Sequence, residues 1–385
     1  MAAWALVGRG ADLANAAAGG IDEHVLRVDY SERQLGAFRL RTRTYNSALP
    51  GPLIVTRPGR TLNIKLINNL PADPPVTAPA GVDRLNNPHA FNTTNLHMHG
   101  MQVVPHLFQP IGTLNPAASM LAIGSGQSMD YTFRLPDDHP SGLYWYHPHY
   151  HGSADVQVVN GMAGLVLVKG PIDDVPEIAA ARDELLAVQN LKLNPLNDAS
   201  SLWGQEPIAY RPAESGGYSP TSKVELITAN GQPIMTIDRR SGKPVAATEA
   251  LPVYKMRPGE VIRLRILNGT DGLFLLLVLT GFEVYVIGQD GINLLKPETA
   301  ADDPKRAIRM APGNRNELLI RAPMHETKGM LRALAHIQPS RPLMNEAMGE
   351  MIHHQKLLSP PLKFPVHPRA WLYLILYPSQ LANIR

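Results

Sequence analysis

Two segments whose numbers differ by 200, Arg57–Asn68 and Arg257–Asn268, each contain a stretch in which apolar and polar residues alternate, 62–66 and 262–266. Each segment opens with Arg-Pro-Gly, which is typical of a turn that leads into a strand. Because side chains alternate between the two faces of a strand, each segment predicts one apolar face and one polar face. The apolar faces are predicted to consist of Leu62, Ile64, Leu66, Ile262, Leu264 and Ile266. We expect the polar faces, Asn63, Lys65, Arg263 and Arg265, to lie in water.

A second pair of segments, Gly126–Arg134 and Gly313–Arg321, is similar in pattern and follows in the same order. The two pairs together indicate a duplicated β-domain. The alternative is a chance match, since a Pro-Gly turn before a strand is common in β proteins. The 31 glycines and 35 prolines exceed the usual shares of about 7% and 5%, which favours a turn-rich β architecture. We therefore predict two β-sandwiches.

We place the first sandwich at residues 20–170 and the second at 223–330. The linker, 171–222, is predicted to hold a short helix over Val175–Val188 and a loop rich in Pro, Ser and Gly. The segment 331–385 lacks a turn–strand rhythm and is predicted to be an irregular or helical tail. Met344, Met348 and Met351 recur there at helical spacing before His353-His354. We interpret them as core methionines of a helix rather than as thioether ligands of Cu(I).

Composition excludes several classes of protein. The net charge of +3 is too small to indicate nucleic-acid binding. The chain has no cysteine, so it can form no disulfide and no thiolate metal ligand. The densest apolar run, Leu273–Thr280, is far shorter than the about 20 residues of a membrane span and predicts a buried strand. We expect no membrane partner, and the N-terminal residues lack a signal-peptide pattern.

Histidines form two His-x-His pairs, His97/His99 and His147/His149. Residues i and i+2 of a strand share one face, about 6.5 Å apart, so each pair can present two imidazoles to one pocket. Imidazole ligands suit copper and zinc, and less often iron or nickel. His151 is a candidate third ligand, but we interpret it as a residue that contacts a metal-binding histidine without binding the metal itself. We expect His106 and His139 to be ordinary surface or loop histidines.

The spacing around these pairs excludes two other metal-binding families. A cupin places a glutamate after its His-x-His pair with three or four residues between, where this chain has Val103 and Val104. A metallo-β-lactamase site requires His-x-His-x-Asp-His, and the run His147–His151 lacks the aspartate.

The order of motifs resembles that of the multicopper oxidases, which include laccases and bilirubin-oxidase-like enzymes. The resemblance covers about residues 35–335. It rests on the following segments: Tyr45–Pro52, Arg57–Gly59, Asn92–Gly100, Trp145–His149, Gly161–Val168, Met256–Glu260 and Met310–Arg315. It implies an all-β fold of tandem cupredoxin-like Greek-key β-sandwiches.

The resemblance also implies roles for individual histidines. His97 corresponds to a type 2 copper ligand, and His99, His147 and His149 correspond to type 3 ligands. The family takes four more histidines, and the cysteine that binds type 1 copper, from a third domain with His-x-His and His-Cys-His motifs. This sequence has neither motif after His151. The resemblance therefore implies copper in partial type 2 and type 3 sites, no type 1 copper, and no residue that we would name catalytic.

Three functions remain open at this point. The one we favour is an oxidoreductase lineage that couples oxidation of a small aromatic or metal-ion reductant to reduction of O2, with its last domain truncated, frameshifted or supplied by a second chain. The others are a non-catalytic cupredoxin scaffold and a copper carrier. The family implies a periplasmic or secreted location, which no leader in this sequence supports.

Overall fold

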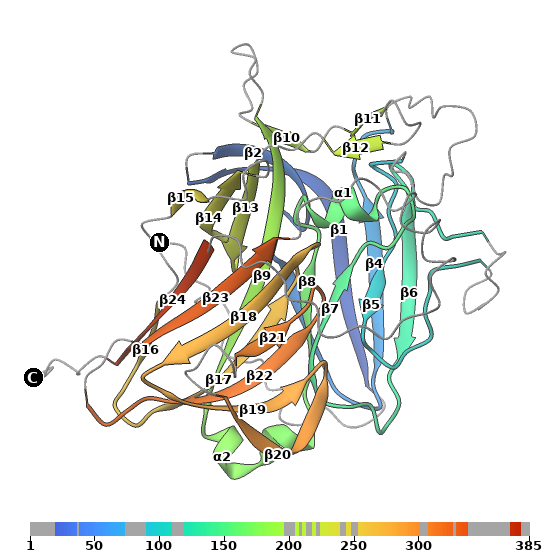
Figure 1. Cartoon of the computed structure of the whole chain (residues 1–385). Helices are drawn as coiled ribbons and strands as arrows, with labels where there is room; N and C mark the ends of the chain where they lie inside the picture. Colours follow the sequence, from blue (N-terminus) through green and yellow to red (C-terminus); the bar gives the residue numbers. More distant parts are fainter. Residues whose placement is uncertain are drawn as a thin grey trace, which may run out of the picture.

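Strands make up most of the protein in the computed structural model, which confirms the all-β prediction (Figure 1). The helices of the described residues are short: α1 (Ala154–Val158), η2 (Pro171–Asp174) and α2 (Pro176–Ala179). None of them is long and apolar enough to cross a membrane. The structure describes residues 20–36, 38–73, 90–109, 119–195, 205–207, 210–212, 218–220, 224–238, 244–247, 253–300, 307–325, 329–337 and 370–378.

The first sandwich packs two four-stranded layers face to face. One layer has the order β2 (Phe38–Tyr45), β1 (Ile21–Leu35), β4 (Thr61–Asn68), β6 (Ser128–Arg134). The other has the order β3 (Gly51–Thr56), β8 (Gly164–Val168), β7 (Gly142–His147), β5 (His97–His99). Leu62, Ile64 and Leu66 of β4 are fully buried in the core between the layers, as the alternation predicts.

The second sandwich repeats this plan with more strands. Its larger layer contains β20 (Ile292–Ala300), β19 (Glu283–Gln289), β22 (Arg315–Arg321), β17 (Val261–Asn268), β9 (Arg182–Pro195), β13 (Val224–Ala229), β14 (Gln232–Asp238) and β15 (Pro244–Ala247). Its other layer has the order β16 (Val253–Met256), β24 (Ala370–Pro378), β23 (Gly329–Ile337), β18 (Leu273–Thr280), β21 (Ile308–Met310). The core between them includes Ile262, Leu264 and Ile266.

A three-residue strand, β10 (Gln205–Pro207), joins the two sandwiches into one continuous 13-stranded sheet. It pairs with β2 on one side and with β9 on the other. A separate hairpin forms from β11 (Tyr210–Pro212) and β12 (Tyr218–Pro220). The fold is thus that of tandem cupredoxin-like β-sandwiches.

The duplication extends to individual hydrogen bonds. Asn68 Nδ2 donates to the carbonyls of Asn92 and Ile123 at the end of β4. Asn268 Nδ2 donates to two carbonyls at the same point of β17. Gly126 and Gly313 each donate a backbone N–H to the corresponding asparagine carbonyl, with φ of 72° and 83°. The shared asparagine and glycine therefore perform the same structural task in both copies.

The outer face of β7 and β8 packs against the second sandwich rather than against water. A small apolar cluster forms there from Leu143, Trp145, Ala163, Leu165, Ala187 and Leu267. Both faces of β7 are consequently buried, since Tyr144 and Tyr146 point into the first core. We call this contact between the sandwiches the seam.

The prediction that Arg263 and Arg265 lie in water is wrong. Their side chains are 1% and 0% exposed because the seam covers this face of β17. Arg263 donates to Asp173 and to Glu317 at 2.8 and 2.5 Å. Arg265 donates to Asp173 at 2.8 Å and to Asp183 at 2.9 Å. Two arginines that look like surface residues therefore belong to a buried ion network.

The predicted helix over Val175–Val188 is also wrong for most of its length. The helix ends at Ala179, and β9 begins at Arg182. β9 pairs with β17 and β13, so strand pairing determines the conformation of this segment instead of its local helical pattern.

The expected irregular tail contains β24 and most of β23, which complete a sheet of the second sandwich. The methionine-rich stretch and the histidines at 353 and 354 lie outside the described residues.

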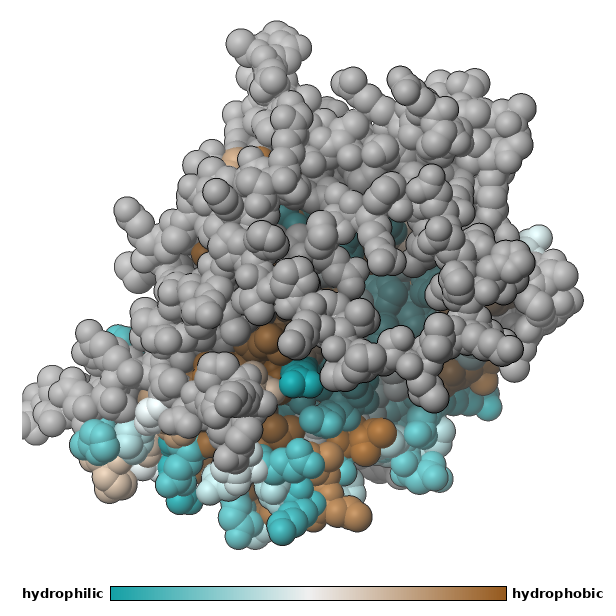
Figure 2. Space-filling view, viewed as in Figure 1, coloured by the Kyte–Doolittle hydropathy of each residue, from teal (hydrophilic) through white to brown (hydrophobic). Residues whose placement is uncertain are grey.

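Large apolar side chains are exposed on β20, with Ile292 at 64% and Leu295 at 108%. Figure 2 shows brown apolar residues interspersed with teal polar residues over the lower part of the visible face, so its coloured residues do not form one apolar surface.

Candidate metal centre

The two His-x-His pairs lie on neighbouring antiparallel strands. β5 pairs with β7 so that His97 is opposite His147 and His99 is opposite Trp145. Between the two histidines of β5, Met98 points into the first core, so His97 and His99 share the opposite face. The strand pairing thus brings both pairs to one place.

Three imidazoles converge closely. One ring nitrogen from each of His97, His99 and His147 lies within 4.8 Å of the other two. His99 Nδ1 and His147 Nε2 are 3.1 Å apart. When two imidazole nitrogens bind the same ion, each at about 2.0 to 2.1 Å, they lie roughly 3 Å from each other. The pair His99 and His147 therefore has the spacing of two ligands to a common ion.

His149 completes the group from the loop after β7. Its ring centroid lies 5.1 Å from that of His97. Its backbone N–H donates to Asn95 Oδ1 at 2.7 Å, which fixes the loop against β5. Its Nδ1 is buried and has no hydrogen-bond partner in the part of the chain that the structure describes. A buried, unpartnered imidazole nitrogen beside three others is the kind of atom that a bound cation would satisfy.

Burial keeps these imidazoles neutral. Desolvation, followed by the neighbouring His149 and His99, lowers the pKa of His97 to about 3. Desolvation, followed by the charge of Arg315, lowers the pKa of His99 to about 4. Burial also lowers the pKa of His147 and of His149. Neutral imidazoles have the free lone pair that metal ligation requires, so the group is ready to bind a cation at neutral pH.

A backbone carbonyl selects the tautomer of one histidine. His147 Nδ1 lies 2.8 Å from the carbonyl oxygen of Pro148, to which it donates when protonated. This arrangement leaves the Nε2 lone pair of His147 directed at the cluster. Carbonyls of this kind commonly orient metal-binding histidines, and nothing in the His-x-His spacing indicates which acceptor is used.

His151 stands next to the group rather than inside it. Its ring stacks on His149 with centroids 5.7 Å apart, and its backbone N–H donates to the sulfur of Met120. It is not one of the three residues whose ring nitrogens converge. This position suits the supporting role expected from the sequence, which remains a prediction.

His139 lies in the loop between β6 and β7, as one of the two expectations had it, but it is not a surface residue, because it is 2% exposed. Its Nε2 accepts a hydrogen bond from the backbone N–H of Gln102, and its Nδ1 faces the carbonyl of Pro140 at 2.8 Å. It is therefore a buried structural residue that fixes two loops. His106 is half-buried against the rings of Tyr131 and Phe133.

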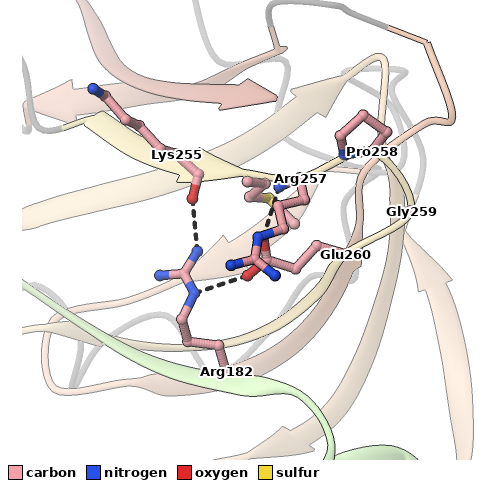
Figure 3. A pocket seen from close by; sticks show the side chains of 7 residues that line it. Arg182, Lys255, Arg257, Pro258, Gly259 and Glu260 are labelled. Carbon is pink, nitrogen blue, oxygen red and sulfur yellow. Dashed lines mark hydrogen bonds and ion pairs between the residues drawn. The ribbon is translucent and has the colours of Figure 1, made fainter. Parts of the chain in front are cut away.

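An open pocket of about 660 Å³ lies elsewhere, around the Pro-Gly turn before β17 (Figure 3). It contains several basic side chains, but Arg182 already donates to Glu260, Glu184 and the carbonyl of Lys255. The guanidinium of Arg182 is thus already bonded to other groups of the protein, and we do not regard this pocket as the functional site.

Comparison with known proteins agrees with the fold. Residues 80–172 match the family model described as multicopper oxidase. Laccase-1 of Thanatephorus cucumeris is 24% identical over 274 residues, which are 70% of this chain and 40% of that protein. The multicopper oxidase MmcO of Mycobacterium tuberculosis is 26% identical over 276 residues, 69% of this chain and 46% of that protein.

Among solved structures, a multicopper oxidase from Campylobacter jejuni, described as a metallo-oxidase, superimposes with a TM-score of 0.58 at 20% identity. The match covers 95% of this chain and 59% of that one. The fold and the site define a cupredoxin-type protein with a clustered set of histidines. Residues 80–172 thus resemble a multicopper oxidase domain, a family that implies copper as the cofactor, and the chain is similar over most of its length to laccases and other multicopper oxidases. It spans less than half the length of the two curated relatives above.

Proposed function

We propose that the first sandwich binds copper through His97, His99, His147 and His149. The observation that carries the proposal is the convergence of three ring nitrogens within 4.8 Å of one another. The unpartnered Nδ1 of His149 and the lowered pKa values of the cluster support it. An all-imidazole donor set fits copper, whereas calcium and magnesium prefer oxygen ligands.

Each histidine has a part in this proposal. The 3.1 Å approach of His99 Nδ1 to His147 Nε2 supports assigning these two residues to one ion of type 3 character. His97 takes the type 2 position, and His149 contributes to the type 3 pair. Asn95 and the carbonyl of Pro148 orient His149 and His147. The Met98 and Tyr146 side chains in the core hold the strand pair that carries the imidazoles.

The similarity to laccases and other multicopper oxidases supports the proposal that this chain is part of an oxidoreductase. When bound, copper supplies one-electron redox chemistry, which multicopper oxidases use to couple oxidation of a small aromatic or metal-ion reductant to reduction of O2 to water. This sequence has no cysteine for a copper–thiolate site. We therefore propose that the remaining ligands come from a polypeptide segment outside this sequence, and that this chain alone does not turn over a reductant.

Copper analysis tests the binding proposal. The purified chain is reconstituted with Cu(II), and metal content is compared between the wild type and His97→Ala, His99→Ala and His147→Ala. His106→Ala is the matched control, because His106 packs on aromatic rings and is not one of the converging residues. We expect bound copper in the wild type and in the control, and loss of most of it in the three cluster variants.

Oxygen uptake with a phenolic reductant tests the proposal that this chain alone does not turn over a reductant. Bound copper without blue copper–thiolate absorption and without turnover is the expected result. A chain that stays free of metal under copper-replete conditions contradicts the proposal and favours a scaffold without copper.

A further inference from the structure

A turn of the second sandwich touches the histidine cluster of the first. The turn joins β21 to β22, and Gly313 lies in it with φ of 83°. A Cβ atom built on Gly313 would lie 3.2 Å from Cε1 and 3.4 Å from Nε2 of His99, and 3.6 Å from Cζ2 of Trp145. The backbone of the turn is therefore packed directly against the His99 ring, at a distance that only glycine permits without a shift of its neighbours.

Two side chains that follow this turn hold the strand that carries His147. β5 ends at His99, opposite Trp145, so Leu143 of β7 has no partner residue in β5. Its backbone N–H donates to Glu317 Oε1 at 2.8 Å, and its carbonyl accepts from Arg315 Nε at 3.0 Å. The second sandwich thus supplies the hydrogen bonds that a longer β5 would have supplied.

These contacts lie on the same face as the site. Leu143, Trp145 and His147 alternate along β7, so all three point toward the seam. Trp145 links the second sandwich to both histidines, since its ring centroid lies 4.7 Å from that of His99 and 4.2 Å from that of His147. The two ligands proposed to share an ion are packed on one aromatic side chain, and the second sandwich packs behind it.

We propose that the second sandwich positions the copper ligands of the first, with Gly313 as the positioning residue for His99, and Arg315 and Glu317 as the positioning residues for β7. The inference rests on the copper site proposed above. If it holds, copper affinity depends on contacts from the second sandwich, although all four proposed ligands belong to the first.

The duplication provides a matched pair of variants. Gly313→Ala adds a methyl group against His99 at a position with positive φ. Gly126→Ala adds the same methyl group at the equivalent position of the first sandwich, where φ is 72° and no atom of the described residues lies within 4 Å of the new Cβ. Both variants carry the backbone strain of alanine at positive φ, and only the first one disturbs the histidine.

The measurement is Cu(II) affinity of the full chain by competition with a chelator, together with the electron paramagnetic resonance spectrum of the bound ion. Loss of a residue that orients a ligand typically weakens metal binding by about 10- to 100-fold. We expect Gly313→Ala to bind at least about tenfold more weakly than wild type with an altered copper hyperfine coupling. Gly126→Ala should stay within about twofold of wild type, with an unchanged spectrum.

A second variant covers the case in which Gly313→Ala fails to fold. Arg315→Lys keeps the positive charge near His99 and removes the guanidinium that bonds to Leu143, so we expect a smaller loss of affinity and the same direction of spectral change. Equal affinity and identical spectra of Gly313→Ala and Gly126→Ala overturn this inference while leaving the copper site intact. Absence of copper from the wild type instead overturns the proposed function.

Discussion

Strands β4 and β17 occupy equivalent positions in the two sandwiches but bury different fractions of their surface. Each follows a Pro-Gly turn, faces its core with three aliphatic residues and ends in an asparagine that donates to two carbonyls. On the other face, Lys65 of β4 is exposed, whereas Arg263 and Arg265 of β17 are buried in the seam. The two strands share a local pattern and differ in what covers them.

This difference shows which properties are local and which depend on the assembled fold. Alternation and turn chemistry specify the strand and its core face, because they act within a few residues. Whether the second face meets water depends on β7 and η2, which come from other parts of the chain. Charged residues are tolerated there because Asp173, Asp183 and Glu317 neutralise the arginines.

The largest test of this comparison removes one carboxylate from each sandwich. Glu317→Ala leaves Arg263 and Arg265 with less compensation in a buried site, and we expect a loss of about 3 to 5 kcal/mol in the free energy of unfolding. Asp130, at the equivalent position of β6, is exposed. Asp130→Ala should change stability by no more than about 0.5 kcal/mol. Urea unfolding of both variants gives the comparison, and similar losses would show that the seam does not differ energetically from a solvated face.

The next test compares how much copper binding stabilises each sandwich. At a free copper concentration 100 times the dissociation constant, binding to the native state alone stabilises it by about 2.7 kcal/mol. We expect hydrogen exchange to slow in β5 and β7 more than in β18, which belongs to the second core. A chelator should reverse the effect, and His99→Ala should lack it. Equal slowing throughout the chain would mean that the sandwiches unfold only as one unit.

The shared asparagines test the similarity of the two copies rather than their difference. Asn68→Ala and Asn268→Ala each remove a side-chain donor from two buried carbonyls, and we expect either change to cost about 2 kcal/mol. In each sandwich one of the two carbonyls keeps a second donor, the N–H of Thr94 for Ile123 and the hydroxyl of Thr270 for Leu273. Unfolding free energies measured side by side should agree within about 0.5 kcal/mol. A clearly larger loss at one position would show that the duplicated pattern does not perform the same task.

The smallest expected effect is a dependence of the seam on pH. Burial raises the pKa of Asp173, but the N–H of Gly170 and the guanidinium of Arg265 outweigh burial and hold this pKa below its ordinary value of 3.8. A lowered pKa contributes stability that is complete above the unfolded pKa and is lost as pH falls through the folded one. Wild type should therefore lose stability below about pH 4 more steeply than Asp173→Asn, as measured by urea unfolding between pH 6 and 3. Parallel curves for the two proteins would contradict the assignment.

Much of the fold could be predicted from the sequence because the relevant information is local. The Pro-Gly turns, the alternation after them and the apolar run at β18 predict strands that the structure contains. The helix predicted over Val175–Val188 failed where pairing with β17 outweighs local preference. β24 was missed because the segment 331–385 has no turn–strand rhythm, and its strand forms by pairing with β16 and β23.

For the site, the His-x-His spacing predicts which imidazoles share a face, but not what surrounds them. The pairing of His97 with His147 joins residues about 50 positions apart, and the motif order suggested it only through the family resemblance. Gly313 and Arg315 lie more than 200 positions from His99, and no spacing links them to it. The burial of His139 was missed for the same reason, since its partner, Gln102, belongs to a distant loop.

One consequence of the bond between Leu143 and Glu317 concerns synthesis of the chain. The partners are 174 residues apart in sequence. At about 5 to 20 residues per second on the ribosome, β7 waits roughly 9 to 35 s for the segment that covers its seam side. During this interval the nascent first sandwich exposes an unsatisfied strand edge and an apolar face, which are the features that recruit chaperones or promote association between chains.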